Sequence, residues 1–382
     1  MKRGVGKILV TRSSMPEIDE YVNEIRNLWD SHWLTNMGEK HNELEKKLAN
    51  FWNIRKEQLT LFVNGHQALE CIFEAMKLGK EKNKFGEIKN EVITSPYTFA
   101  STIHALVRKG LKPVFCDINQ NNFTINTAMI EGLITRRTCA IVPIHVYGNV
   151  CNVEDIEEIA SKNNLKVVYD SAHAFGVTYR GKSIAKYGDA SMFSFHATKV
   201  FNTIEGGAAC FKNDNLKPLL EKCKNFGITG PESVEFIAGN AKMNEFSAAM
   251  GICNLRHFRE EMEKRKKVDD RYRERLTGID GLTINVIQKE VKRNYAYFPL
   301  IVDESKFGYT RDVILEKLAE NEVYARKYFY PIASAFECYS GMFRKEDTPI
   351  ALEISKRVLT LPMYAGLDLK TVDKICDIIV NY

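Results

Sequence analysis

The feature that most constrains the fold of this chain is the alternation of short apolar segments with helical segments between about residues 59 and 211. Each apolar segment is bounded by turn residues, as buried strands are, and the segments between them have helical spacing. This alternation predicts a mostly parallel sheet with helices on both faces. After a first strand near residue 59, further strands are predicted at residues 91–95, 113–117, 139–146, 166–170 and 190–195.

Length and composition predict two domains. A chain of 382 residues with 45% hydrophobic residues can bury a substantial core and normally divides. Beyond residue 248 the chain becomes highly charged, and residues 256–276 carry apolar side chains at roughly helical intervals: Phe258, Met262, Tyr272 and Leu276. We therefore expect a long amphipathic helix that connects a large domain, residues 1–250, to a smaller α/β domain, residues 251–382.

Lys199 follows a predicted buried strand, in a segment that also contains the hydroxyl groups of Ser194 and Thr198. A lysine forms an imine only through its neutral amine, and burial favours that form. The two hydroxyl groups can hold a phosphate close to the lysine, and Gly206 and Gly207 let the backbone approach a ligand closely. Together these residues indicate a site for pyridoxal 5'-phosphate (PLP).

A second candidate is Asp170, which ends the predicted strand at residues 166–170. In open α/β sheets, ligands bind beyond the carboxyl ends of the strands. A carboxylate there can keep the pyridine nitrogen of PLP protonated, which makes the ring an electron acceptor. Ala172 is small enough to lie under a flat ring, and His173 can reach its phenolic oxygen. The alternative for Asp170 is a helix N-cap after a strand.

The third candidate is the Asn64-Gly65-His66 turn, where a short apolar strand gives way to a helical pattern. The free amides of a helix start bind anions, so Gly65 and His66 can receive a phosphate together with Ser194. An ordinary turn is the alternative.

With these segments the chain resembles the DegT/StrS family of PLP-dependent nucleotide-sugar aminotransferases over most of its length. The matching motifs occupy residues 31–38, 64–66, 96–102, 143–149, 166–176, 194–208 and 239–249. The resemblance implies the α/β fold of the fold-type-I aminotransferases. That fold has a mostly parallel seven-stranded sheet with helices on both faces and a smaller C-terminal α/β domain.

The resemblance also implies a role for individual residues. Lys199 would form the Schiff base with PLP and Asp170 would contact the pyridine nitrogen, as the two catalytic residues. The cofactor-binding set would be Gly65, His66, Phe99, Asp170, Ala172, His173, Ser194, Lys199 and Asn240. Asn240 would come from a neighbouring subunit, so a homodimer with shared active sites is expected. Substrate contacts would come from Trp33, Asn36, His196, Lys242 and Tyr330.

Two positions depart from the family pattern. His66 stands where many relatives have threonine, and Lys242 stands where many have arginine. Both changes keep a polar donor, so they bear on the details of the site rather than on cofactor binding.

The lysine loop from His196 to Ala208 is similar to that of family members that act at carbon 4 of the sugar. The implied reaction transfers the amino group of L-glutamate to a nucleotide-linked 4-keto-6-deoxy sugar, with dTDP-4-dehydro-6-deoxyglucose as the best candidate. PLP and pyridoxamine 5'-phosphate would alternate in ping-pong order, and the product would serve surface polysaccharide or glycoconjugate synthesis. The alternatives are amination at carbon 3 or of another nucleotide sugar, a dehydratase, and a non-enzymatic sugar-binding protein with this fold.

The remaining sequence features argue against other classes of function. The net charge of +5 is small, and the basic run at residues 264–267 is interleaved with acidic residues, so no nucleic-acid partner is expected. Nine scattered cysteines favour reduced thiols in a cytoplasmic enzyme. The histidines lack local metal-ligand spacing, and no segment approaches the length of a membrane span, so neither a metal nor a membrane is expected.

Overall fold

Seven strands form the central sheet in the computed structural model, which describes residues 6–381. Across the sheet their order is β2 (Leu59–Phe62), β10 (Gly207–Phe211), β9 (Ala190–Ser194), β6 (Lys166–Asp170), β5 (Thr138–Val142), β3 (Glu91–Thr94) and β4 (Lys112–Phe115). Of these strands, β10 alone runs in the direction opposite to the other six. The predicted seven-stranded, mostly parallel sheet is therefore confirmed.

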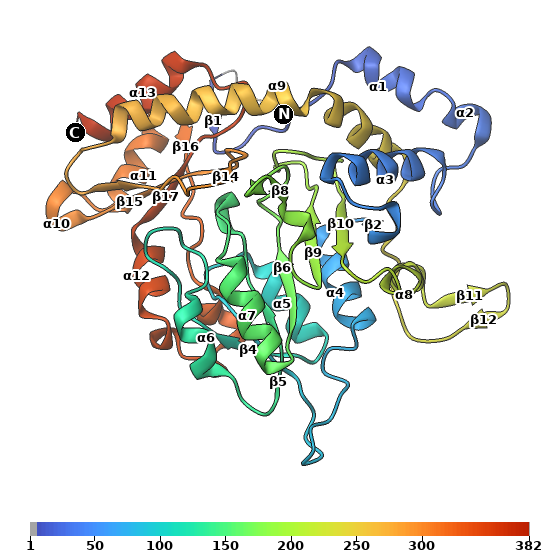
Figure 1. The fold of residues 1–382 in the computed structure, drawn as a ribbon. Helices are drawn as coiled ribbons and strands as arrows, with labels where there is room; N and C mark the ends of the chain where they lie inside the picture. The colour runs from blue at the N-terminus through green and yellow to red at the C-terminus, as the bar shows by residue number, and fades with distance from the viewer. Residues whose placement is uncertain (1–5, 382) are drawn as a thin grey trace.

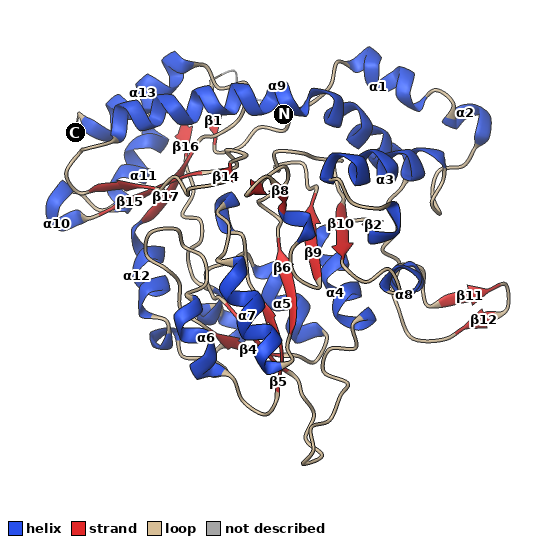
Figure 2. Ribbon diagram, viewed as in Figure 1, coloured by secondary structure: helices blue, strands red, loops and turns tan. Residues whose placement is uncertain are grey.

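Helices cover both faces of the sheet, as Figure 2 shows. Side chains alternate between the faces along each strand, so Phe193 packs in one apolar core with Trp52 and Met192 packs in another with Leu69. The first face is covered by α3 (Glu39–Trp52), α6 (Thr127–Leu133), α7 (Val153–Asn163) and the first part of α9 (Glu245–Leu276). The second face is covered by α4 (Gly65–Ala75), α5 (Ala100–Arg108) and α8 (Leu216–Cys223).

The long helix predicted over residues 256–276 is present, but α9 starts earlier, at Glu245, and contains 32 residues. Its first part packs in the core of the large sheet through Ala248 and Ile252. Its last part packs in a separate core through Tyr272 and Leu276. The sequence pattern missed the first part because it is buried on nearly all sides and shows no charged face. The predicted boundary between residues 250 and 251 falls within α9, and the division there stays a prediction.

A smaller α/β unit follows α9. Its antiparallel sheet has the order β13 (Leu282–Ile284), β15 (Phe298–Val302) and β17 (Val358–Leu361). The helices of this region are α10 (Glu304–Phe307), α11 (Arg311–Glu320), α12 (Pro349–Arg357) and α13 (Leu369–Val380). The buried carboxylate of Asp117, beyond β4, accepts hydrogen bonds from the amides of Ile350 and Ala351, both at 2.8 Å. It thereby fixes the start of α12 against the large sheet.

The N-terminal segment also contacts this smaller unit. β1 (Ile8–Leu9) pairs in parallel with β16 (Val323–Tyr324), and the amide of Met363 donates to the carbonyl of Val10 at 3.0 Å. α1 (Ile18–Ile25) then packs against α9 and is followed by α2 (Leu28–Ser31).

The remaining elements are short. β7 (Thr178–Tyr179), β8 (Lys182–Ser183) and β14 (Val291–Lys292) form a small sheet, and β11 (Ile228–Gly230) pairs with β12 (Ser233–Val234) in a hairpin that extends from the body (Figure 1). The 3-10 helices are η1 (Lys56–Gln58), η2 (Val146–Gly148), η3 (Ile184–Lys186), η4 (Ala333–Ala335), η5 (Glu337–Tyr339) and η6 (Lys345–Asp347).

The basic run on α9 is not a uniform cationic surface. Lys264 pairs with Glu260 at 2.8 Å and Lys266 with Asp270 at 2.5 Å, as expected for a solvated helix face. Arg265, however, is buried and donates to the carbonyl of Met363 at 3.1 Å. One of the four positive charges is therefore withdrawn from the surface.

The cysteines, all within residues 6–381, are free thiols. Across the same residues, no cluster of three or more His, Cys, Asp or Glu side chains is arranged to hold a metal ion. The helices there include none with the length and apolar character to cross a bilayer.

Candidate active site

The segments predicted to carry the chemistry meet at one edge of the central sheet. β6 ends at Asp170, β9 ends at Ser194, and β2 leads into Gly65 at this edge because parallel strands share the position of their carboxyl ends. The antiparallel β10 begins at the same edge, where Gly207 pairs with Ser194. The loop that follows β9 carries Lys199. Residues far apart in the sequence are thereby brought to one place (Figure 1).

Asp170 is buried, with 4% of its surface exposed. The Thr102 hydroxyl on α5 donates to its Oδ2 at 2.6 Å, and the Ala172 amide donates to its Oδ1 at 3.0 Å. Burial raises the pKa of Asp170, while these hydrogen bonds and the charge of Lys199 oppose the rise. Asp170 begins no helix, so the N-cap alternative is wrong. Thr102 was not predicted, because only tertiary structure brings α5 to β6.

Lys199 lies beside two tyrosines that the sequence did not single out. Its Nζ is 6.0 Å from the centroid of the Tyr297 ring, and the ring centroids of Tyr297 and Tyr328 are 5.9 Å apart. Burial lowers the pKa of Lys199, against opposing effects of Tyr328 and Asp170. The lowered pKa increases the neutral fraction of the amine, which is the reactive form. Both tyrosines come from the smaller unit, so the site lies where the two units meet.

His173 has its protonation fixed by the backbone. The amide of Tyr147 donates to Nδ1 of His173 at 3.0 Å, so Nδ1 acts as the acceptor. Burial, together with the charge of Lys199, lowers the pKa of His173 well below its usual value. The neutral ring therefore carries its proton on Nε2, which remains free to donate. Tyr147 takes this position with a left-handed backbone, at φ 57°, a conformation that is strained for a non-glycine residue.

The start of α4 forms a cradle of backbone donors. Asn64 caps the helix by accepting from the amide of Gln67 at 2.8 Å, which leaves the amides of Gly65 and His66 without partners inside the helix. Gly65 lies close to Ser194, because a Cβ on Gly65 would be 3.1 Å from the Cβ of Ser194. The turn is therefore a capped helix start beside a hydroxyl group, as predicted for an anion site. We call the amides of Gly65 and His66 with the hydroxyl of Ser194 the phosphate cradle.

Lys199, Asp170 and His173 are called the cluster below. Phe99 and Ala172 flank Asp170 in the sequence, and both lie near this cluster. Phe99 immediately precedes α5, has 53% of its surface exposed, and has its ring centroid 6.3 Å from that of Tyr328. Ala172 is half-buried and bonded to Asp170 through its amide. The exposure of the large apolar Phe99 ring is consistent with a surface that receives a flat ligand.

Asn240 and Lys242 lie at the base of the β11–β12 hairpin. Asn240 is exposed, and its backbone forms a bridge with Asn225. The Lys242 amine donates to Oδ1 of Asn225 at 2.7 Å and lies 4.8 Å from the centre of the Phe226 ring. Within residues 6–381, no hydrogen bond or ion pair joins either residue to Lys199 or Asp170. Their predicted roles stay predictions that require a second subunit.

The other predicted substrate residues lie on exposed segments. Trp33 and Asn36 belong to the loop after α2, which is held to the start of α9 by the Glu245 amide bonded to the carbonyl of Leu34. His196 is exposed near Lys199 and lies 3.7 Å from Glu205. Their contacts with a substrate stay predictions.

Tyr330 directly follows a turn that carries Tyr328 and Phe329. Tyr330 is half exposed, and the Arg311 guanidinium lies 5.1 Å from its ring centre. Phe329, by contrast, is buried and stacks on His173 at 5.7 Å. The segment thus combines packing with exposed polar groups, and the substrate contact of Tyr330 stays a prediction.

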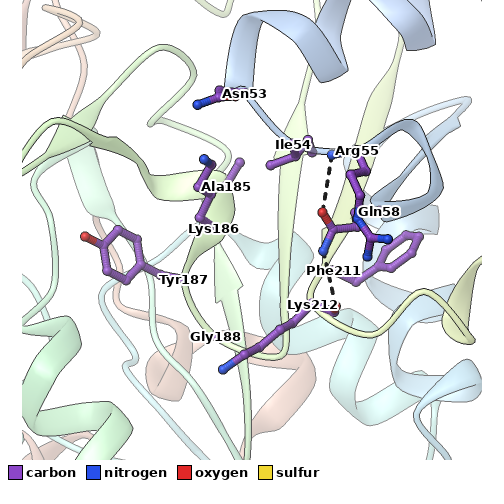
Figure 3. A pocket seen from close by; sticks show the side chains of 10 residues that line it. All are labelled: Asn53, Ile54, Arg55, Gln58, Ala185, Lys186, Tyr187, Gly188, Phe211 and Lys212. Atoms are coloured by element: carbon purple, nitrogen blue, oxygen red, sulfur yellow. Dashed lines mark hydrogen bonds between the residues drawn. The ribbon is translucent and has the colours of Figure 1, made fainter.

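A hollow at the opposite edge of the sheet is unrelated to this cluster. Figure 3 shows this cavity of about 370 Å³, whose lining residues come from residues 53–58, 185–188 and 211–212. Its position follows from the strands, because β9 starts and β10 ends there. Gln58, which lines the cavity, accepts a hydrogen bond from the Arg55 amide and donates one to the carbonyl of Lys212. None of the predicted site residues lines it.

The residues of the cluster fit PLP. A Cβ on Gly207 would lie 2.6 Å from the backbone of Asn64 and Gly65, and a Cβ on Gly65 would lie 2.8 Å from Met192. A methyl group at either position would come too close to these neighbours, so the two glycines keep the cradle open. An amine, a buried carboxylate and a neutral imidazole are the groups that PLP chemistry needs, and all three lie near the cradle.

Comparison with known proteins gives one consistent answer. The profile of the DegT/DnrJ/EryC1/StrS aminotransferase family matches residues 16–380. A dTDP-4-amino-4,6-dideoxy-D-glucose transaminase of Shigella dysenteriae is 40% identical over 94% of this chain and 95% of its own length. An enzyme with the same description from Escherichia coli is 37% identical over 98% of both chains.

Solved structures agree with these matches. The crystal structure of DesI in the presence of its TDP-sugar product superposes with a TM-score of 0.91 at 29% identity, covering 99% of this chain and 93% of DesI. Helicobacter pylori PseC, an aminotransferase involved in the biosynthesis of pseudaminic acid, superposes with a TM-score of 0.89 at 24% identity, covering 98% of both chains. The latter likeness supports the fold alone.

Proposed function

Because this chain belongs to the DegT/DnrJ/EryC1/StrS aminotransferase family, we propose that it transfers the amino group of L-glutamate to carbon 4 of a nucleotide-linked 4-keto-6-deoxy sugar. The proposed acceptor is dTDP-4-dehydro-6-deoxyglucose and the proposed product is dTDP-4-amino-4,6-dideoxyglucose. The 37–40% identity with the two bacterial transaminases supports this choice. Family membership confirms the prediction of an aminotransferase, and it makes the non-enzymatic alternative the weaker one.

The observation that carries the proposal is the placement of Lys199, Asp170 and the phosphate cradle at one edge of the sheet. A binding protein would not need a half-buried lysine with a lowered pKa at the same sheet edge as a buried carboxylate. PLP, when bound, supplies an aldehyde that takes up an amino group and a ring that accepts electrons.

The residues of the chain supply the proton transfers. The amine of Lys199, whose pKa is lowered by desolvation, removes the proton from the α-carbon of glutamate and returns a proton in the following step. The same group acts in reverse order when the keto-sugar takes the amino group. One base therefore serves both halves of the reaction. Because 2-oxoglutarate leaves before the sugar enters, ping-pong kinetics are expected.

Asp170 and His173 are proposed to set the charge around the pyridine ring of PLP. Asp170, oriented by Thr102 and by the Ala172 amide, holds a proton at the ring nitrogen. His173, with Nδ1 occupied by the Tyr147 amide, can donate from Nε2 to a phenolic oxygen. Tyr297, Tyr328 and Phe99 line this region with aromatic surface, which limits the access of water.

The test follows one half-reaction at a time. The purified PLP form is treated with L-glutamate until its visible absorbance band is lost, excess glutamate is removed, and dTDP-4-dehydro-6-deoxyglucose is added. We expect the band to return in stoichiometric yield, with the new amine at carbon 4 by nuclear magnetic resonance. The matched acceptor is dTDP-3-dehydro-6-deoxyglucose, which differs only in the position of the keto group and should leave the spectrum unchanged.

Other outcomes discriminate between the alternatives. Return of the band with the 3-keto sugar alone would replace the carbon-4 proposal by carbon-3 amination. No band before the glutamate step, with PLP supplied, would contradict PLP-dependent chemistry in this chain.

We also propose that a second copy of the chain completes the site. Asn240 is exposed and Lys242 half-buried at the base of a hairpin that extends from the body. Apolar side chains are exposed on this hairpin at Val234 and just after it at Ile237, which has 99% of its surface exposed. Burying such side chains between two copies would remove apolar surface from water. We expect light scattering to give twice the chain mass at micromolar concentration. A fully active protein with the mass of one chain would contradict the proposal.

A further inference from the structure

The loop that carries Lys199 contains a strained residue, Ile204. Its backbone is left-handed, at φ 68°, a conformation that β-branched residues rarely adopt. The residue has 45% of its surface exposed, so packing of its side chain does not by itself explain the conformation. Strain of this kind persists only where the surrounding structure enforces it, and it is common at functional sites. The contacts that hold Ile204 therefore bear on the position of Lys199.

Asn202 makes contacts that hold this backbone, and it is buried, with 1% of its surface exposed. Its Oδ1 accepts a hydrogen bond from the amide of Ile204 at 3.2 Å, and its Nδ2 donates to the carbonyl of Ser14 at 3.1 Å. Its own carbonyl accepts from Nδ2 of Asn254 on α9 at 2.9 Å. The side-chain amide supplies a donor and an acceptor together, whereas an alanine would leave both backbone groups without this partner. Asn202 therefore ties the loop to α9 and to the segment that follows β1.

The two ends of the loop are joined through the backbone. The amide of Phe195 donates to the carbonyl of Gly206 at 2.8 Å, and the amide of Thr203 donates to the carbonyl of Phe195 at 2.9 Å. Lys199 lies between the end that follows β9 and the end that Asn202 holds. A change in the backbone after Asn202 would therefore shift the span that carries the amine.

We propose that Asn202 is a positioning residue, which holds the strained backbone at Ile204 and thereby keeps the amine of Lys199 where it reacts with the cofactor. A displacement of about 1 Å can lower a rate about 10²-fold. Within residues 6–381, the side chain of Asn202 bonds to Ser14 and Ile204 and not to Asp170 or the phosphate cradle. The inference rests on the proposed function and adds to it a residue that places the amine without touching the cofactor.

Two forms of the cofactor separate the position of the amine from the rest of the site. With PLP, the amine of Lys199 adds to the aldehyde, one water leaves, and a visible absorbance band reports the Schiff base. Pyridoxamine 5'-phosphate has no aldehyde, so its binding does not require Lys199. In the apoprotein at saturating PLP, we expect Asn202→Ala to slow the appearance of the band about 10- to 100-fold. The affinity for pyridoxamine 5'-phosphate, measured by calorimetry, should be nearly unchanged.

A second substitution tests the strain itself. Glycine adopts the left-handed backbone readily, so Ile204→Gly makes the support from Asn202 less necessary. In the Ile204→Gly protein, adding Asn202→Ala should therefore slow the band much less than it does in the wild type. Each rate is compared with that of the parent that has the same residue at position 204, so any separate effect of losing the isoleucine side chain cancels. Asn202→Ser takes the place of Asn202→Ala in this cycle if the alanine variant does not fold.

Asn126→Ala is the matched control. Asn126 also accepts a hydrogen bond from the amide two residues later, that of Ala128 at 3.2 Å, but it caps α6. This variant should lower the melting temperature and leave both cofactor measurements unchanged.

Three results would overturn the inference: band formation at the wild-type rate in a folded Asn202 variant, an equal loss for both cofactor forms, or an equal loss with isoleucine and with glycine at position 204. A wild-type protein that forms no band with PLP would instead contradict the proposed function. Circular dichroism identifies the folded variants before the rates are compared.

Discussion

Replacing Lys199 by alanine is expected to lower turnover of glutamate and keto-sugar by at least about 10⁴-fold, which is the upper range for loss of a general acid–base group. The loss should be this large because, among residues 6–381, Lys199 is the one lysine with a lowered pKa that interacts with Asp170. The protein should remain folded, since the change removes a half-buried amine and leaves the surrounding aromatic packing intact. Steady-state turnover and a thermal melt would be measured together.

The matched control is Lys186→Ala. Lys186 lines the cavity of Figure 3, which lies at the edge of the sheet where β9 starts and β10 ends. This variant should keep full turnover. Near-normal turnover of Lys199→Ala, with the control also active, would refute the central role of Lys199, whatever the identity of the sugar.

The second large effect is expected for Asp170→Asn. The amide keeps the size of the side chain and a hydrogen bond from Thr102, but it removes the negative charge that holds a proton at the ring nitrogen. We expect turnover to fall about 10²- to 10³-fold, as for loss of a preorganised electrostatic group. Binding of pyridoxamine 5'-phosphate should weaken much less, because the cradle is unchanged. The readouts are turnover and calorimetry.

Asp189→Asn is the control for this substitution. Asp189 accepts from the amide of Val167 at 2.9 Å, at the start of β9 and thus at the opposite edge of the sheet. The same chemical change there should leave turnover intact. If Asp170→Asn were as active as Asp189→Asn, the buried carboxylate would have only a structural role. The proposal that it keeps the pyridine nitrogen of PLP protonated would then be wrong.

The parts of the fold and site that could be predicted from the sequence are those set by local pattern. The strand alternation and the rule that ligands bind at carboxyl ends were enough to place Lys199, Asp170 and Gly65 at one edge. Each lies within a few residues of a strand end, so its position follows once the strand is located. The antiparallel direction of β10 was not predicted, because a short apolar strand carries no mark of its direction.

The parts that could not be predicted depend on contacts over long sequence separations. Thr102 reaches Asp170 across 68 positions, and Tyr297 and Tyr328 reach Lys199 from the smaller unit. No periodicity encodes such contacts, since they result from how helices and sheets pack. Glu70 is an intermediate case. Its spacing of four residues from His66 on a helix was visible in the sequence, but its ion pair with Arg108 needed the packing of α4 on α5.

The pairing of β1 with β16 has a consequence for the order in which the molecule can be completed on the ribosome. Leu9 is made near the start of synthesis, but its partner Tyr324 follows more than 300 residues later. At a synthesis rate of roughly 5–20 residues per second, the first strand has to wait about 15 to 60 s for that partner. The central sheet, whose strands are all made by residue 211, can assemble during this time. β1 therefore pairs only after the central sheet can form, and Tyr297 and Tyr328, the tyrosines near Lys199, are added among the later steps.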